Sequence, residues 1–555
     1  MVERFTARSG APSLRMDGIA LHSPYDPARE ADRFIEGSLR GENPSTIVLL
    51  GEGLGYATRA IGERMPSVRL IRVFYSEEVF RFCQADRPPS WHPGSPQSIA
   101  DFLRANIGEL DMEGLRAIEW QPSASLFPSL SRSANEALRQ VLQELNGSLV
   151  TTLAAGRLWI RNSIANFLCL DRSLAGAPCG PARTVVVAAS GRSLERALPL
   201  LARARGSVEL WALPSSALFL KENGVRPDLL VMTDPGHWSM VHLHFADPPC
   251  PIAMPLSAAR GIWRFRRTAG APLLLSQPSF FEEQLLDAAG VAAPRIAPHG
   301  TVAATALDLA LSCTRGPVVA TGLDMCAEDI ATHCRPNAFD ELLWLQEGRV
   351  RPHLSQSFHR VAAQEVARER SGATTTRILR SLRTYAGWFS GESPLDRGRL
   401  FRLHSSPVTL PRFAPLNGDE FLALAAAHAG AKPGPGLHDD EGYPDRAHRD
   451  DIVARLLSLW AEAVAQGVRG LRDEGLSVFG GSPVLFPLAY HVDARGLLNA
   501  RKKARAGDAS GALEAAESIL ARCAQFLREL VEKSSTLQAS STPQASSTPQ
   551  ASSHA

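Results

Sequence analysis

The stretch TVVVAASGRSLE, residues 184–195, decides the fold of this chain. Its first half is apolar and β-branched, which is typical of a buried strand, and its second half turns through glycine and serine into a helical pattern. Two further apolar runs follow at residues 208–213 and 228–233, and the second leads to Asp234. Strand, tight turn, helix and strand in this order predict an α/β fold with a central open, mostly parallel, Rossmann-like sheet.

Later segments extend this sheet and place side chains at its carboxyl edge. Short strands are expected in three more places, at residues 251–255, 272–276 and 317–322. The last of them leads to Asp324. Because the carboxyl ends of parallel strands meet at one edge, the turn with Gly191 and Ser193 should share that edge with Asp234 and Asp324.

A smaller α/β domain is expected before the central one. A buried-strand pattern at residues 45–50 runs into the turn GEGLG at residues 51–55, and a second strand pattern follows at residues 69–74. Glycines in such a turn let the backbone approach a ligand, and the GxGxG spacing resembles a methyltransferase loop more than a dinucleotide loop. The alternative is that these glycines only close a tight strand–helix turn.

Composition divides the chain into four parts. Residues 1–150 are expected to form the N-terminal α/β domain and residues 155–350 the central domain, with Gly/Pro-rich linker composition around residues 171–183. Residues 351–533 are expected to be a mainly helical C-terminal region. Residues 534–555 contain the repeat ASSTPQ twice and are expected to be a disordered tail.

Charge and cysteine usage narrow the class of protein. The chain has 555 residues and a net charge of +2, so no global electrostatic attraction to nucleic acid is expected. The basic cluster at residues 263–267 is interpreted as a solvated face. Eight cysteines form no CxxC pair, which favours reduced thiols in a cytoplasmic protein. The closest grouping is Cys326, His333 and Cys334, and no metal site is expected there. No apolar run reaches 18 residues, so no membrane span is expected.

The candidate chemistry lies in the turns. Backbone N–H groups and the Ser193 hydroxyl at the start of a helix suit the binding of a phosphate, and Arg192 adds a positive charge. The turn is not a Walker loop, because no Gly-Lys-Ser/Thr follows. Gly300-Thr301 before an Ala/Leu-rich helix is a second such start. Asp234 and Asp324 suit a general base, a ribose ligand or a Mg²⁺ ligand. The alternative for each aspartate is a turn cap at a strand end.

Four motifs carry a resemblance to a known family. They are SGRSL at 190–194, GVRPDLLVMTDP at 224–235, GTVA at 300–303 with LDLA at 307–310, and TGLDM at 321–325. In order and spacing they resemble the MptE-like domain, which is shared by the motility accessory factor (Maf) flagellin glycosyltransferases and archaeal 6-hydroxymethylpterin pyrophosphokinases. This resemblance covers roughly residues 155–350. The domain with the GEGLG turn resembles the Maf N-terminal domain, and residues 376–416 resemble the region after the Maf core, so the layout favours Maf.

The resemblance implies transfer of a nonulosonic acid, of the pseudaminic or legionaminic type, from its CMP-sugar to Ser or Thr of flagellin, with a sialyltransferase-like core. It places Asp234, Asp324 and His333 in the catalytic cleft. It assigns donor binding to Gly191, Arg192, Ser193, Leu194, Gly300, Thr301 and Gly322, with no metal assigned. The first alternative is an MptE-like pyrophosphokinase that uses ATP and Mg²⁺ on a hydroxymethylpterin, and the second is a non-catalytic flagellar binding protein.

Several positions depart from the family pattern, and two of them lie in the predicted turn and the helix after it. Arg192 stands where the family usually has a proline, which predicts either extra help for an anion or a changed pocket. Pro199 lies inside the expected helix, where it should break or kink the helix.

Overall fold

The computed structural model describes most of the chain, namely residues 2–83, 88–247, 250–262, 271–278, 280–297, 299–371, 374–387, 389, 398–404, 406–431 and 436–540. The basic cluster at 263–267 and the tail from 541 lie outside these residues. The chain divides into two compact units. The first holds residues 1–154, 467–481 and 493–521, and the second holds residues 155–466, 482–492 and 522–555.

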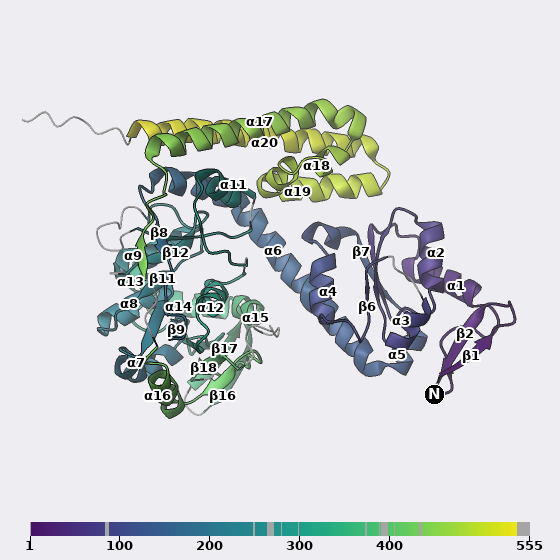
Figure 1. Cartoon of the computed structure of the whole chain (residues 1–555), viewed down its shortest axis with the longest axis horizontal. Helices are drawn as coiled ribbons and strands as arrows, with labels where there is room; N and C mark the ends of the chain where they lie inside the picture. Colours follow the sequence, from purple (N-terminus) through teal and green to yellow (C-terminus); the bar gives the residue numbers. More distant parts are fainter. Residues whose placement is uncertain are drawn as a thin grey trace, which may run out of the picture. The chain divides into compact units, whose positions relative to one another are not determined.

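The first unit contains a small parallel sheet in the order β6-β5-β4-β7 (Figure 1). Its strands are β4 (Thr46–Leu50), β5 (Arg69–Val73), β6 (Ser90–Trp91) and β7 (Leu115–Glu119). An antiparallel sheet of β1 (Val2–Thr6), β2 (Pro12–Met16) and β3 (Ile19–Ala20) precedes it. The helices are α1 (Pro27–Leu39), α2 (Tyr56–Arg64), α3 (Glu77–Cys83), α4 (Ile99–Asn106), the 3₁₀ helix η1 (Glu109–Gly114), α5 (Gln121–Leu126) and α18 (Ser477–Gly480). The predicted α/β character of this part is confirmed.

The second unit is built on a sheet in which the described residues form ten strands, in the order β19-β18-β14-β9-β10-β11-β12-β13-β8-β20. Only the edge strand β20 runs antiparallel to its neighbour. The strands are β8 (Leu174–Gly176), β9 (Thr184–Ala188), β10 (Val208–Ala212), β11 (Leu229–Val231), β12 (Ile252–Pro255), β13 (Leu273–Leu275), β14 (Val318–Thr321), β18 (Leu400–Leu403), β19 (Ala414–Leu416) and β20 (Leu437–Asp439). This confirms the predicted open, mostly parallel sheet.

The direction of the strand order reverses beside β9. From β9 the chain proceeds outward through β10, β11, β12 and β13, and it then returns to add β14 on the other side of β9. In open parallel sheets, ligands bind outside the carboxyl ends of the strands at such a switch point. The turns after β9 and β14 therefore define the candidate site.

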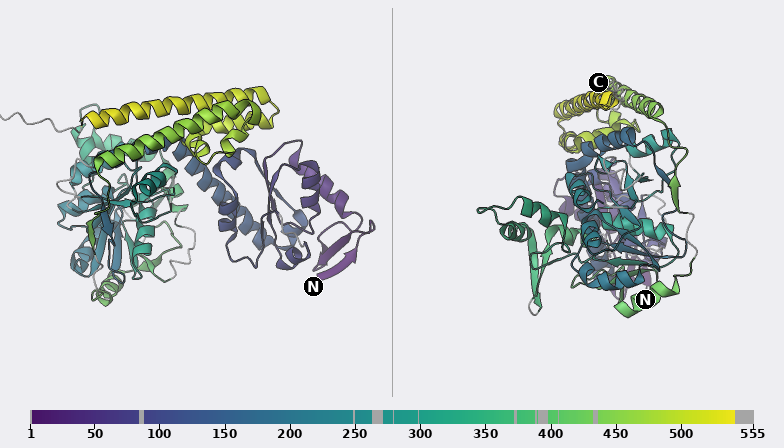
Figure 2. Two further views of the ribbon diagram at one scale, coloured as in Figure 1. Left: turned by 45° about the horizontal axis from the view of Figure 1, so that its top comes forward. Right: turned by 90° about the vertical axis from the view of Figure 1, so that its left-hand side faces the viewer.

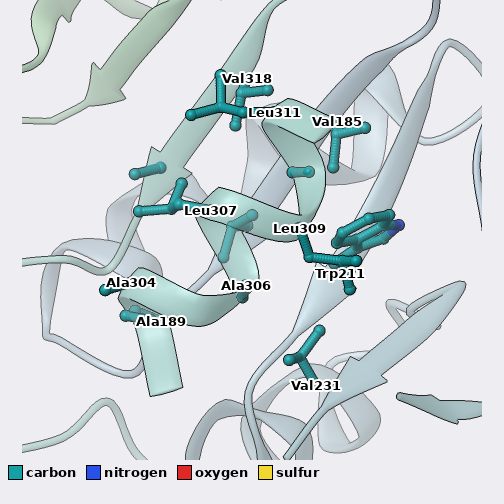
Figure 3. Packing of buried hydrophobic residues seen from close by; sticks show 14 of the residues in the cluster. Val185, Ala189, Trp211, Val231, Ala304, Ala306, Leu307, Leu309, Leu311 and Val318 are labelled. Atoms are coloured by element: carbon teal, nitrogen blue, oxygen red, sulfur yellow. The ribbon is translucent and has the colours of Figure 1, made fainter. Parts of the chain in front are cut away.

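Helices cover this sheet, and α12 (Val302–Cys313) forms the centre of one hydrophobic core. Leu307 and Leu311 of α12 pack with Val185 of β9 and Val318 of β14, and Trp211 of β10 closes the cluster (Figure 3). The other helices that lie wholly in this unit are α7 (Ser193–Ala204), α8 (Pro214–Glu222), α9 (His237–Ala246), α11 (Phe280–Ala289), α13 (Ala338–Leu345), α14 (His353–Ala362), α15 (Arg380–Gly387) and α16 (Gly418–Ala427). Because the chain crosses over between parallel strands, α7 and α12 both begin at the carboxyl edge.

The structure differs from the sequence expectation in three places. The segment 351–533 contributes β18, β19 and β20 to the central sheet, and β16 (Glu365–Ser371) and β17 (Thr374–Leu379) form a separate antiparallel sheet with β15 (Ala327–Glu328). Of the break or kink expected at Pro199, the break does not occur, because α7 continues through this residue to Ala204. The segment expected as a tail begins as helix, since α20 continues to Ser540.

Four long helices have residues in both units. They are α6 (Pro128–Cys169), α17 (Arg446–Glu474), α19 (Leu485–Arg505) and α20 (Ala509–Ser540). Asp493 interrupts α19 with non-helical backbone angles. It is also the first residue of this helix that belongs to the first unit, since residues 482–492 belong to the second.

Candidate functional site

The turn after β9 lies directly against the turn after β14. Gly191 N donates to Gly322 O at 2.7 Å, and Ser190 O accepts from Cys334 N at 2.7 Å. A Cβ on Gly191 would lie 2.5 Å from Asp324 Oδ2 and 2.7 Å from Gly322 O. A glycine is therefore required at 191 by close approach, since its space is taken by the neighbouring turn.

Asp324 occupies the N-terminus of α7. Its Oδ2 accepts from Ser193 N at 2.8 Å, and its Oδ1 accepts from Ser193 Oγ. Both side chains are buried, with Asp324 only 6% exposed. A carboxylate is a favourable group at a helix N-terminus, where free N–H groups and the helix dipole attract negative charge. The position predicted for a ligand phosphate at Ser193 is thus filled by a carboxylate from the chain itself.

A buried arginine fixes the backbone that carries Asp324. Ser406 Oγ donates to Asp324 O at 2.6 Å, and Arg402 Nη2 donates to Ser406 Oγ at 2.7 Å. Arg402 Nη1 also donates to Val408 O at 2.8 Å. Burial lowers the pKa of Arg402, while the charge of Asp324 acts in the opposite direction. Arg402 is not among the site residues expected from the sequence, where its signal is a charged residue within the apolar strand LFRL at 400–403.

The remaining residues of the predicted phosphate turn have structural partners. Arg192 forms an ion pair with Glu195, and Glu195 Oε1 also accepts from Arg335 N at 2.8 Å. Leu194 is fully buried beneath the turn. The charge of Arg192 is therefore compensated, and Leu194 contributes to packing.

Asp234 lies at the same edge but not beside Asp324. Its Oδ1 accepts from Gly236 N at 2.6 Å, its backbone oxygen accepts from Ala259 N at 2.9 Å, and its side chain is exposed. Three strand positions separate β11 from β14, which places the two aspartates roughly 14 Å apart. Burial, and after it the charge of Asp234, raises the pKa of Tyr385, which puts this tyrosine near Asp234.

Two buried asparagines of α6 hold the loops after β11 and β12. Asn162 Nδ2 donates to Pro235 O at 3.0 Å and to Ser257 O at 3.1 Å. Asn166 Nδ2 donates to Leu256 O at 2.8 Å and to Ala258 O at 2.9 Å. The spacing of four residues places both amides on one helix face. Asn162 contacts the loop that carries Asp234, and Asn166 contacts the loop after β12.

Gly300 and Thr301 lie at the start of α12. Thr301 Oγ1 accepts from Ala304 N at 3.0 Å and so caps the helix. The helix contacts β9, β11 and β14. Asp324 fills the N-terminus of α7, whereas no carboxylate is recorded among the described residues at the start of α12.

His333 lies in a cluster of rings formed by α9 and α13. Its ring centroid is 6.4 Å from that of His242 and 5.2 Å from that of Phe339, and its Nδ1 lies 2.8 Å from Thr332 Oγ1. Burial, together with His242 and Arg360, lowers the pKa of His333 to about 3, and burial lowers that of His242 to about 4. Both imidazoles are therefore neutral near pH 7, and His333 is a weak base in this state.

The glycine-rich turn of the first unit is filled by a histidine. Leu54 N donates to His22 Nε2 at 2.9 Å, and a Cβ on Gly53 would overlap the His22 ring. Glu52 is buried and bonded to Thr58 and to Gly53 N, and burial raises the pKa of Glu52. The close packing of this turn accounts for the glycine at position 53.

Within the described ranges, no group of three or more His, Cys, Asp or Glu side chains has an arrangement that could hold a metal ion. Across the same part of the chain, no helix has the length and hydropathy needed to cross a membrane.

Comparison with known proteins finds a family model that matches most of the central sheet. Residues 171–329 match the family model described as 6-hydroxymethylpterin diphosphokinase MptE-like. The chain contains an MptE-like domain. The switch-point turns after β9 and β14, with Gly191 and Asp324, fall within this MptE-like domain, whereas Arg402 lies after it.

Longer matches extend beyond the MptE-like domain. The structure of a Maf glycosyltransferase from Magnetospirillum magneticum AMB-1 matches 97% of this chain and 92% of its own, with a TM-score of 0.54 and 13% sequence identity. The two proteins therefore share a fold over nearly their whole lengths. An uncharacterized protein of Treponema pallidum (strain Nichols) is 24% identical over 335 residues, which cover 60% of this chain and 69% of that protein. A second match to an uncharacterized protein of that strain is 25% identical over 210 residues, 35% of this chain and 70% of the relative.

Proposed function

We propose that this chain is a Maf-like glycosyltransferase that transfers a nonulosonic acid from a CMP-sugar to a Ser or Thr hydroxyl of flagellin. The observation that carries the proposal is the fold shared with the Magnetospirillum Maf glycosyltransferase over 97% of the chain. A fold match that includes the N-terminal unit and the C-terminal helices favours this function over one performed by an isolated MptE-like domain.

The geometry supports a division of roles along the carboxyl edge. In transfer, the bond between the anomeric carbon and the CMP phosphate oxygen breaks, a bond to the acceptor hydroxyl oxygen forms, and the hydroxyl proton passes to a base. Asp234 is exposed and ionisable, which suits that base. Asp324 is buried and accepts from Ser193 N, which holds the turn after β14 against the start of α7. The start of α12, with Gly300 and Thr301, offers N–H groups to an anionic group of the donor, and Gly191 and Gly322 let the two turns approach each other.

An exposed apolar surface supports a protein acceptor. Large apolar side chains with at least 48% exposure gather on α13, α14 and the segment between them: Trp344, Leu345, Val350, Leu354 and Phe358. Figure 2 (right) shows the arm formed by these helices and the β16–β17 hairpin, coloured teal to green, projecting from the central sheet. Exposed large apolar side chains that gather on neighbouring elements are typical of a protein-binding site.

We expect a strain that lacks this chain to produce flagellin of lower mass, and the wild-type gene to restore the glycan. Asp234→Asn keeps the oxygen that accepts from Gly236 N but loses the charge, so the turn should persist while transfer falls by about 100-fold or more. Asp440→Asn is a matched control, because Asp440 makes the same contact with Gly442 N at the far edge of the sheet. Intact-mass spectrometry of flagellin provides the measurement. Fully glycosylated flagellin in the deletion strain would contradict the proposal.

The second candidate is a pyrophosphokinase that uses ATP, Mg²⁺ and a hydroxymethylpterin. It is favoured by the description of the model that matches residues 171–329. Release of AMP when the purified chain is incubated with these three components would support it over transfer from a CMP-sugar.

A further inference from the structure

A small polar cavity lies between the loop after β14 and helix α14. Thr332, His333, Asn337 and Asp340 line one side, and Ser357 and Arg360 line the other. The same loop is bonded to the turn after β9 through Cys334 N and Ser190 O at 2.7 Å. The cavity is thus attached to the switch-point site but is formed by different side chains.

The cavity contains one uncompensated positive charge. Asp340 Oδ2 already accepts from Arg335 Nε at 3.0 Å and from Asn337 Nδ2 at 3.2 Å, so its charge is balanced. His333 is neutral. Among the described residues Arg360 has no ion pair, and its guanidinium lies over the Phe339 ring, 5.4 Å from the centroid.

A buried hydroxyl without a partner lies in the same wall. Ser357 is 5% exposed, and its Oγ has no hydrogen-bond partner among the described residues. Burying an unbonded polar group is costly, so such a group in a native protein indicates a ligand or a water. An O–H donor and a guanidinium one helical turn away on α14 are typical of a site for an oxyanion.

We propose that the cavity lined by Ser357 and Arg360 binds a single oxyanion of the substrate. Two groups of the donor in the proposed function share this chemistry, namely the phosphate of the nucleotide and the carboxylate of the sugar acid. The existence of the site does not depend on the proposed function, whereas the identity of the bound group does.

The test uses the full chain and its thermal stability in titrations of inorganic phosphate, acetate, CMP and a CMP-linked nonulosonic acid. Inorganic phosphate or acetate should stabilise the wild-type protein, and Arg360→Gln should weaken that binding about tenfold or more. Ser357→Ala should weaken it by several-fold, or about 1 kcal/mol for one hydrogen bond. Arg383→Gln, which removes an exposed arginine of α15, is the matched control and should leave binding unchanged.

The outcomes separate the two sources. If Arg360→Gln weakens CMP and the CMP-sugar alike, the cavity holds the phosphate, and if it weakens only the CMP-sugar, the cavity holds the carboxylate. Suppose that the wild-type chain binds phosphate or acetate and loses this binding in Arg360→Gln, but neither binds CMP nor transfers sugar. That result would support the anion site and contradict the proposed function. Absence of any stabilisation by phosphate or acetate, or equal binding by wild type and Arg360→Gln, would overturn the site even if transfer is observed.

Discussion

Replacing Asp324 with alanine should lower the free energy of unfolding of the central sheet by about 3 kcal/mol. The carboxylate accepts two buried hydrogen bonds, from Ser193 N and from Ser193 Oγ, and truncation leaves both donors without a partner. It also removes a negative charge from the N-terminus of α7, where such a charge is stabilising. Urea denaturation followed by circular dichroism measures the change.

Two companion variants show whether capping is the cause. Asp324→Asn keeps the size and one acceptor oxygen, so it should lose less stability than Asp324→Ala. Ser193→Ala removes only the hydroxyl and should cost about 1 kcal/mol. If Asp324→Ala were as stable as the wild type, the carboxylate would have no capping role, and a purely catalytic assignment would regain support.

Gly322→Ala should destabilise the chain by about 4 kcal/mol or more, or prevent folding of the central sheet. Gly322 has a φ of +67°, which disfavours any side chain, and its Cβ would overlap the backbone oxygen of Ala189. The neighbouring strands β9 and β14 would have to separate to make room, at the point where their turns meet.

Gly224→Ala is the matched control for this effect. Gly224 has a φ of +69°, but a Cβ there would meet no atom within 4 Å. It should therefore show only the conformational cost of about 1–2 kcal/mol. Equal losses in the two variants, measured by the same urea titration, would show that close approach of the two turns contributes nothing.

The sheet could be predicted from the sequence because its strands are short, apolar and separated by clear turn residues. The expected runs at 184–189, 208–213 and 317–322 each contain the observed strand and extend at most one residue beyond either end. β-branched runs of this kind have few alternatives to a buried strand. Strands β16 and β17 were not predicted because EVARERS and TTTRIL are polar. The described residues pair these strands with each other and with β15, in a sheet separate from the main one.

The partners at the site could not be predicted, because they depend on contacts between distant parts of the chain. Asp324 caps a helix that begins 131 residues earlier. Ser406, which bonds the Asp324 backbone, and Arg402, which bonds Ser406, lie outside residues 155–350. The ion pair between Arg192 and Glu195 could have been predicted from the sequence, since residues three apart are neighbours on a helix turn. It explains why the residue that departs from the family pattern carries no free charge.

The proposed function requires that the carboxyl edge of the MptE-like domain at the switch point binds a CMP-linked donor. Thermal unfolding of the purified chain with CMP, with ATP and Mg²⁺, and with S-adenosylmethionine tests it most directly. At a concentration of 100 times Kd, a ligand that binds only the folded state adds about 2.7 kcal/mol of stability. We predict that CMP raises the midpoint of unfolding and that the other two leave it unchanged. Stabilisation by ATP and Mg²⁺ without any effect of CMP would contradict the claim.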